Sequence, residues 1–230
     1  MSGDRPIAVV IPVRDGEGFL AEAIESALAH PHVGEVVVVD DGSADGSLAL
    51  ARSYRGVETL ALGSTRGPAA ARNAGLATIR APVVSFLDGD DRWPEFGASG
   101  DPRLTRLLAD PELDFVVGRL RMFRCEADGS VTYSEPRRQL QVGAALYRRR
   151  IFDRVGPFDE ALVGCEDFDW YARAREAGAR IEQIDDVTLF YRRHAGNLTA
   201  DPEVRRHLVA LPVRAALLRR RAGKPEEPPK

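Results

Sequence analysis

The stretch Val36-Val37-Val38-Val39-Asp40-Asp41-Gly42-Ser43 decides the fold class. Its four valines form a continuous apolar run, which is typical of a strand buried on both faces, and the acidic pair and glycine end that run. Similar runs occur at residues 7–11, 57–62 and 83–87, and segments with helical spacing of apolar residues separate them at 19–29, 47–53 and 68–79. This alternation predicts an α/β fold with a mixed, mostly parallel sheet flanked by helices.

The second half of the chain has a different pattern of shorter elements. We expect a short helix at 104–109, a helix at 167–177 ended by Gly178, and strands at 114–118, 120–123, 131–134, 144–147, 181–184 and 188–193. Residues 203–221 have the spacing of a basic amphipathic helix, and residues 222–230 form a polar tail. We therefore divide the chain into a domain at 1–202, with halves 1–95 and 96–202, and a C-terminal segment at 203–230.

Composition excludes several classes of protein. The chain has 230 residues and is 44% hydrophobic, so it buries a core without a disulfide or metal. Its formal net charge of −3 argues against a nucleic-acid binder. Its only lysines are Lys224 and Lys230, so the lysines required by P-loop, Schiff-base and protein-kinase chemistry are missing. Cys125 and Cys165 form no C-x-x-C motif. With no signal peptide and no long apolar run, we expect a cytoplasmic protein.

Acidic residues follow the predicted strand at 83–87, in Phe86-Leu87-Asp88-Gly89-Asp90-Asp91-Arg92-Trp93. Three carboxylates within four residues repel one another unless a cation or hydrogen-bond donors lie close. Mg²⁺ and Mn²⁺ bind carboxylates together with substrate phosphates, so a metal–diphosphate site and a solvated acidic turn are both open. An EF-hand loop is excluded because Trp93 stands where its glycine is required. A dehalogenase-like phosphatase would need a lysine that this region lacks.

Four other groups have two interpretations each. Asp40 and Asp41 suit a ligand's ring N–H and ribose hydroxyls, or a turn. Arg72 suits a phosphate, or a surface salt bridge. A carboxylate in Glu166-Asp167 suits a general base, or the favourable first turn of a helix. His194 suits a metal, or a structural role.

Seven motifs in order resemble those of family 2 glycosyltransferases, which are inverting enzymes of the GT-A fold. The resemblance runs from residue 7 to about residue 199. It is carried by the segments 9–20, 39–45 (V-D-D-G-S-x-D), 71–75 (A-R-N-x-G), 86–93 (F-L-D-x-D-D-x-W), 143–162 (similar to R-x-x-F-x-x-V-G-x-F-D-E), 166–170 (E-D-x-D-W) and 191–194 (Y-R-x-H). In this chain Arg14 replaces the aromatic residue usual in the first motif.

The resemblance implies a role for each matching residue. Asp167 would be the catalytic base, deprotonating an acceptor hydroxyl that attacks the anomeric carbon with inversion. Asp88, Asp90 and His194 would hold a divalent cation, Mn²⁺ or Mg²⁺. The nucleotide-sugar site would comprise Pro12, Val13, Arg14, Glu17, Asp41, Arg72, Asp88, Gly89 and Glu166.

The implied donor is a nucleotide-diphosphate sugar, with a UDP-sugar favoured over a GDP- or dTDP-sugar. The implied acceptor is a carbohydrate or a lipid-linked molecule. Two alternatives stay open: a nucleotidyltransferase acting on a sugar phosphate, and a non-catalytic nucleotide-sugar-binding protein. The C-terminal basic segment also has two interpretations, peripheral attachment to an anionic membrane and packing on the domain or a homodimer partner.

Overall fold

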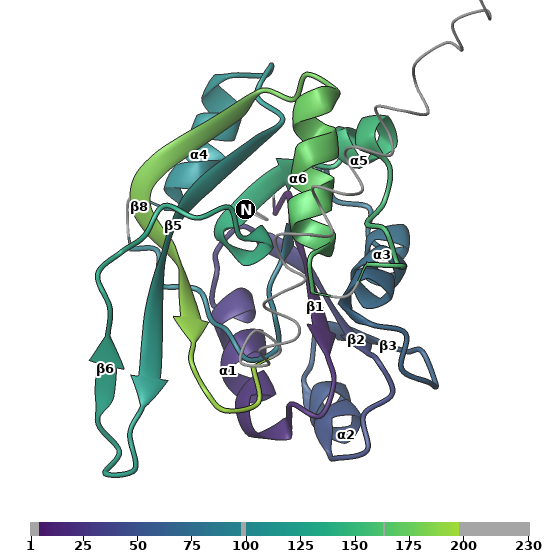
Figure 1. The fold of residues 1–230 in the computed structure, drawn as a ribbon, viewed down its shortest axis with the longest axis vertical. Helices are drawn as coiled ribbons and strands as arrows, with labels where there is room; N and C mark the ends of the chain where they lie inside the picture. Colours follow the sequence, from purple (N-terminus) through teal and green to yellow (C-terminus); the bar gives the residue numbers. More distant parts are fainter. Residues whose placement is uncertain (1–4, 98–99, 163, 198–230) are drawn as a thin grey trace, which may run out of the picture.

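Four parallel strands form the N-terminal half of one eight-stranded sheet (Figure 1). The computed structural model describes residues 5–97, 100–162 and 164–197. β1 (Ile7–Val13) lies between β2 (Val33–Asp40) and β4 (Val83–Phe86), and β3 (Val57–Ala61) pairs with the far side of β2. The connecting helices are α1 (Glu17–Leu28), α2 (Ser47–Ser53) and α3 (Pro68–Thr78). The α/β prediction is confirmed.

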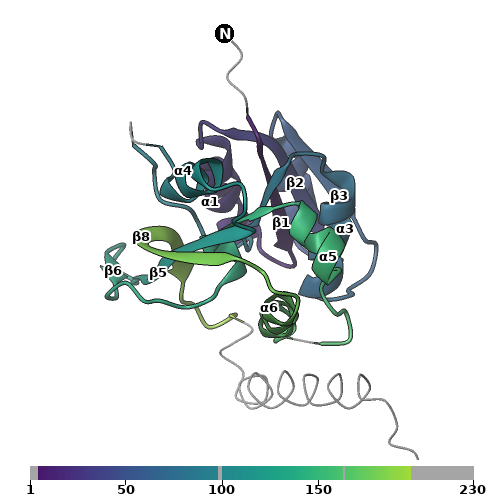
Figure 2. The ribbon, with the colours of Figure 1, turned by 90° about the horizontal axis from the view of Figure 1, so that it is seen from above.

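The second half extends the same sheet with antiparallel and parallel pairs. β7 (Ala145–Arg148) pairs antiparallel with β4 and with β5 (Phe115–Cys125). β5 also pairs antiparallel with β6 (Val131–Tyr133) and parallel with β8 (Ile181–Arg192). The remaining elements are α4 (Pro102–Ala109), the 3₁₀ turn η1 (Val142–Ala144), α5 (Arg150–Val155) and α6 (Glu166–Glu176). Figure 2 shows the sheet from above, with α6 on one of its sides.

Two sequence-based expectations about this half were wrong. The strands expected at 114–118 and 120–123 are one strand, β5, and those at 181–184 and 188–193 are likewise one, β8. Gly118 does not end β5. It lies beside a register shift, where a Cβ would be 2.3 Å from Thr188 Oγ1, so the glycine permits close approach of β8. Helix α5 was not anticipated.

Helix α3 packs close to the sheet because its inner face carries small residues. Ala69, Ala70 and Ala71 are at most 2% exposed. A Cβ on Gly75 would lie 2.3 Å from Val10 Cγ1, so only glycine fits this contact. The close packing fixes the start of α3 beside the carboxyl ends of β1 and β2, where the sequence predicted a ligand site.

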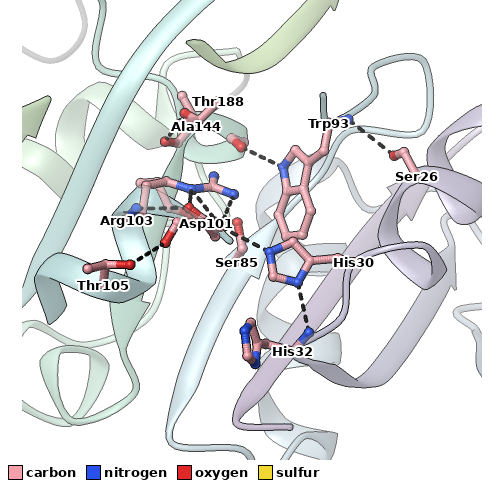
Figure 3. Close-up of polar contacts among 12 residues, drawn as sticks. Ser26, His30, His32, Ser85, Trp93, Asp101, Arg103, Thr105, Ala144 and Thr188 are labelled. Atoms are coloured by element: carbon pink, nitrogen blue, oxygen red, sulfur yellow. Dashed lines mark hydrogen bonds and ion pairs between the residues drawn. The ribbon is translucent and has the colours of Figure 1, made fainter. Parts of the chain in front are cut away.

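A second group of polar side chains is buried away from that edge. It comprises Arg103, Asp101 and His30, and we name it the Arg103 cluster (Figure 3). His30 follows the end of α1, so it lies at the amino end of the parallel strands. The Arg103 guanidinium donates to both oxygens of Asp101, with an Nη2–Oδ2 distance of 2.8 Å. Its Cζ atom lies 4.8 Å from the Trp93 ring centroid. All three side chains are at most 4% exposed.

Within the described ranges, no helix is long and apolar enough to cross a lipid bilayer. The basic segment predicted at 203–221 and the tail at 222–230 lie outside the described residues.

Candidate active site

Two loops at the carboxyl edge of the sheet are held together by side chains. The Asp15 N–H donates to Ser43 Oγ, and Asp15 Oδ1 accepts from the Ala44 N–H at 2.7 Å. Glu17 Oε2 accepts from the Gly46 N–H at 3.0 Å. A Cβ on Gly46 would lie 2.4 Å from Glu17 Oε1, so the loops fit closely. Glu17, predicted to lie near the donor, therefore joins the loop after β1 to the loop after β2.

Four residues that the resemblance assigns to the nucleotide-sugar site meet at the end of β1: Pro12, Val13, Asp41 and Gly89. The Asp41 N–H donates to the Val13 carbonyl at 2.8 Å, and the Gly89 N–H donates to the Pro12 carbonyl at 3.2 Å. A Cβ on Gly89 would lie 3.2 Å from that carbonyl, which leaves little room for a larger residue. Arg14 comes directly after β1 at the same edge, and its side chain is 56% exposed.

The carboxylate of Asp41 is buried and joins β2 to the start of α3. Its oxygens accept from the backbone N–H groups of Arg66 at 2.7 Å and Gly67 at 2.8 Å. Its neighbour Asp40 is 3% exposed, and the Oδ1 atom of Asp40 has no hydrogen-bond partner among the described residues. Buried carboxylate oxygens are normally satisfied, so Asp40 Oδ1 is a polar atom available at this edge.

Arg72 bridges the two halves of the protein. Its Nη2 donates to Asp88 Oδ1 and its Nη1 donates to Glu166 Oε1, each at 2.6 Å. Arg72 is 5% exposed, so the surface salt bridge considered from the sequence is instead a buried one. Burial alone would lower the pKa of Arg72, but the two carboxylates raise it above its usual value. We name Arg72, Asp88 and Glu166 the Arg72 cluster.

Asp167 is the second residue of α6, directly after Glu166, and the pKa of its carboxyl is strongly perturbed. Burial raises the pKa of Asp167 to about 7, the negative charge of Glu166 adds to the increase, and Arg72 opposes it. Its Oδ1 accepts from the Phe168 N–H at 2.8 Å. A carboxyl with a pKa near neutrality exchanges protons readily at cellular pH, as a general base must.

Asp90 is paired with the segment after β8. Its Oδ2 accepts from Asn197 Nδ2 at 3.1 Å and lies 2.9 Å from His194 Nε2. Because His194 Nδ1 accepts from the Gly196 N–H, we assign the ring proton to Nε2, which donates to Asp90. The structure thus brings His194 to Asp90, as expected, but as a hydrogen-bond donor.

Two residues that the sequence reasoning missed hold this arrangement. Asn197 lies three positions after His194, and its Oδ1 accepts from the His194 N–H at 2.7 Å. Asp91 is 1% exposed, and its Oδ1 accepts from the Arg192 N–H at 2.8 Å. The third carboxylate of the acidic run therefore anchors the end of β8. Its place in the run was the available signal, but spacing alone does not show which carboxylate turns inward.

The donor set suits a hard divalent cation. Asp88 and Asp90 lie at the edge with side chains 26% and 29% exposed. Burial and the charge of Asp88 raise the pKa of Asp90, a mutual repulsion that a cation would relieve. Among the described residues, no three His, Cys, Asp or Glu side chains are arranged to hold a metal ion. The two carboxylates would therefore need further ligand oxygens, which phosphates supply to Mg²⁺ in many sites.

Comparison with known proteins identifies the family. The model for Glycosyl transferase family 2 matches residues 8–158. The chain belongs to this family. It is 33% identical over 208 residues to the Succinoglycan biosynthesis protein ExoU of Rhizobium meliloti (strain 1021), which covers 77% of this chain and 59% of ExoU. The chain therefore spans less than two thirds of the length of this relative.

Solved glycosyltransferases have the same fold. The mannosyltransferase PcManGT from Pyrobaculum calidifontis, in complex with GDP-Man and Mn²⁺, superposes with a TM-score of 0.71 at 18% identity, covering 98% of this chain and 66% of that one. S. aureus TarS 1-349 in complex with UDP-GlcNAc gives a TM-score of 0.68 at 22% identity, covering 90% and 66%. The predicted GT-A fold is confirmed.

Proposed function

We propose that this family 2 protein is an inverting, metal-dependent glycosyltransferase that moves a sugar from a nucleotide-diphosphate sugar to an acceptor hydroxyl. The observation that carries the proposal is Asp167. Its carboxyl has a pKa of about 7, and the Arg72 cluster ties the start of its helix to Asp88 at the carboxyl edge of the sheet.

Asp167 acts as the general base. A base works best when its pKa lies near the working pH, because it is then ionised yet still basic enough to accept a proton. The buried start of α6 meets both conditions for Asp167. Glu166 and Arg72 fix the position of this helix terminus by a buried ion pair, so the base is held in one place while the acceptor hydroxyl attacks.

The donor binds at the ends of β1, β2 and β4. Pro12, Val13 and Arg14 line the base pocket, and Asp41 contacts the base. A UDP-sugar is favoured, although the two solved neighbours carry UDP-GlcNAc and GDP-Man. Asp88 and Asp90, with His194 beside them, would hold Mn²⁺ or Mg²⁺. That cation supplies positive charge opposite the diphosphate leaving group.

The acceptor is a carbohydrate or a lipid-linked molecule that approaches from residues 96–202. Peripheral membrane contact or a homodimer through residues 203–221 stays a prediction, as does a cytoplasmic location. Truncation before residue 203, followed by liposome flotation and mass measurement in solution, separates these two roles of the C-terminal segment.

Product analysis tests the proposal. The full chain is incubated with UDP-, GDP- and dTDP-sugars, Mn²⁺ and a set of sugar and lipid-linked acceptors. Release of nucleoside diphosphate supports glycosyl transfer. In a parallel incubation with a sugar phosphate and a nucleoside triphosphate, release of pyrophosphate from the triphosphate would instead show a nucleotidyltransferase. Saturable nucleotide-sugar binding without any release, in the presence of every acceptor class, would show a non-catalytic binding protein.

A further inference from the structure

One face of the sheet beside the candidate active site carries an ordered group of aromatic and arginine side chains. The strand register pairs Phe123 of β5 with Tyr133 of β6, and Arg121 of β5 with Phe190 of β8. Alternate residues of a strand point to the same face, so these four side chains share one face. Arg92, from the segment after Asp90, covers the same rings. We name these five residues the arginine–aromatic platform.

Guanidinium groups and rings alternate across the platform. Arg92 lies 5.0 Å from the ring centroids of both Phe123 and Phe190. The Tyr133 ring lies 6.1 Å from Phe123 and 5.6 Å from Phe190, and Arg121 lies 5.0 Å from Tyr133. These are the distances of cation–π contacts, which hold a guanidinium plane in a fixed orientation.

The platform is fixed relative to Asp90. Arg92 is two residues after Asp90, and its backbone exchanges hydrogen bonds with Phe190 at 3.1 and 2.8 Å. On the same face, Arg192 pairs in register with Phe123 and lies 4.5 Å from its ring centroid. Arg192 also donates from Nε to the Asp90 carbonyl at 2.8 Å. In Figure 1 the β5–β6 hairpin reaches the same end of the molecule as the carboxyl end of β1. A group bound on the platform would therefore adjoin the proposed cation and diphosphate site.

The positive charge of the platform is only partly neutralised. Arg121 donates from Nε to the Ser134 carbonyl at 2.9 Å, and in the part of the chain that the structure describes no carboxylate pairs with it. Arg92 Nε lies 3.6 Å from Glu22, and its Nη2 donates to the Tyr133 hydroxyl at 3.0 Å. Tyr133 is 42% exposed. The platform thus presents a partly exposed ring and an unpaired guanidinium at the same place.

Neighbouring arginines are paired with a carboxylate, unlike Arg121. Arg119, two residues before Arg121 on β5, pairs with Asp185 at 2.7 Å, and Arg138 pairs with the same carboxylate. A guanidinium already oriented by a ring loses little further freedom when it binds an anion, so an unpaired one on such a ring is well suited to a phosphate or carboxylate.

We propose that the arginine–aromatic platform is a subsite for an anionic group on the acceptor, a phosphate or a carboxylate. This rests on the proposed glycosyl transfer, because the subsite adjoins the donor site and would position the acceptor beside it. The anion comes either from the phosphate of a lipid-linked acceptor or from a soluble acidic sugar. In both cases Arg121 forms charge-assisted hydrogen bonds with the anion, while Tyr133 packs against the group that carries it.

Binding by the full chain without donor tests the subsite. The probes are inorganic phosphate, glucuronic acid, and a polyprenyl phosphate in nonionic micelles, with empty micelles as the blank. Arg121→Gln should weaken binding about tenfold, the loss expected for a charge-assisted hydrogen bond. Arg124→Gln is the matched control, because Arg124 is an exposed arginine of the same strand on the opposite face.

Further variants separate recognition from folding. Tyr133→Ala should also weaken binding, and Arg121→Lys should restore only part of it because lysine lacks the planar fork. Thermal melting of each variant checks that the fold is kept. Binding of the micellar probe alone identifies a lipid phosphate, and binding of the soluble probes identifies a soluble anion.

Two results would overturn the subsite: equal losses for Arg121→Gln and Arg124→Gln, or no binding of any probe by the unchanged protein. Binding of UDP with Mn²⁺ is measured on the same samples and should be unaffected by Arg121→Gln. A subsite failure would leave nucleotide binding intact, whereas failure of the proposed function would appear in the nucleotide and product assays with anion binding retained.

Discussion

Two of the buried arginines, Arg103 and Arg72, lie in groups of carboxylates whose charges are balanced differently. At the amino end of the sheet, Arg103 shares Asp101 with the imidazole of His30. Burial alone would raise the pKa of Asp101, but the charge of Arg103 and the hydrogen bond from His30 hold it well below its usual range. At the carboxyl edge, Arg72 faces both Asp88 and Glu166, with Asp167 close by.

The excess of negative charge at the carboxyl edge has an energetic consequence. One arginine does not neutralise the carboxylates around it, so burial and mutual repulsion raise the pKa values of Asp167 and Asp90. The Arg103 cluster therefore stabilises the fold. The Arg72 cluster, together with Asp90 and Asp167, carries an excess of negative charge that a bound cation and substrate would balance. Mutations in the two clusters should therefore separate effects on stability from effects on activity.

The largest effect is expected at Asp167. Asp167→Asn keeps the oxygen that accepts from the Phe168 N–H but removes the base, so turnover should fall by about 10²–10⁴-fold. Nucleotide binding should change little. Steady-state rates and calorimetric titration with UDP and Mn²⁺ measure the two quantities. Asp153→Asn is the control, because Asp153 is an exposed carboxylate of α5. Near-normal turnover of Asp167→Asn would disprove the assignment of the base.

The opposite outcome is expected at Asp101. Asp101→Asn keeps an acceptor for the N-terminus of α4 but leaves Arg103 buried without a counter-charge. The free energy of unfolding should fall by about 3 kcal/mol, as is typical when one partner of a buried ion pair is removed. Urea denaturation gives this value, and turnover per folded molecule should stay near that of the unchanged protein. A loss of turnover with unchanged stability would contradict the division between the clusters.

The sequence predicts the two halves of the fold to different extents. The N-terminal strands and helices were predictable because continuous valine and isoleucine runs and helical spacing are local signals. The extents of β5 and β8 were not, because Gly118 marks a close approach to Thr188, a residue 70 positions away in the sequence. Whether a glycine breaks a strand or permits a bulge depends on that distant partner.

The candidate site was predictable as a set of residues but not as a set of partners. The motifs indicated Arg72, Asp88, Glu166 and Asp167. They did not show that Arg72 pairs with both Asp88 and Glu166, the second of these 94 positions away. The Arg103 cluster gave no motif, because a buried Asp–Arg–His group is recognisable only from its burial. The roles of Asp91 and Asn197 likewise depend on the path of the chain after β8.

A smaller effect on stability is expected from ligands that balance the negative charge at the carboxyl edge. Mn²⁺ with UDP should raise the melting temperature, because a ligand at about 100 times its Kd stabilises the folded state by about 2.7 kcal/mol. Asp90→Asn should remove most of this shift. Asp128→Asn, in the exposed turn of the β5–β6 hairpin, should keep it. Equal shifts in both variants would show that the ligands bind elsewhere.

The smallest effect concerns the pH dependence of stability. Asp167 has an ordinary pKa of 3.8 when unfolded and about 7 when folded, so between these values the folded state holds a proton that the unfolded state has released. Its contribution to stability is complete below pH 3.8 and is lost as the pH rises through 7. Asp101 has the opposite sign, because its lowered pKa contributes stability above pH 3.8 that is lost as the pH falls.

The difference in urea denaturation between Asp167→Asn and the unchanged protein, between about pH 5 and 8, isolates the Asp167 contribution. Asp101 stays ionised over this range, and the raised pKa of Asp90 affects both proteins. Asp167→Asn should lessen the decline and make the protein about 1–2 kcal/mol more stable than the unchanged protein at pH 8. The gain is smaller than the full pKa shift implies because the Asp167 side chain is only half-buried. Asp153→Asn should keep the decline. If the stability difference between Asp167→Asn and the unchanged protein is constant across this range, Asp167 titrates normally. The charges at the carboxyl edge would then be as well balanced as those of the Arg103 cluster.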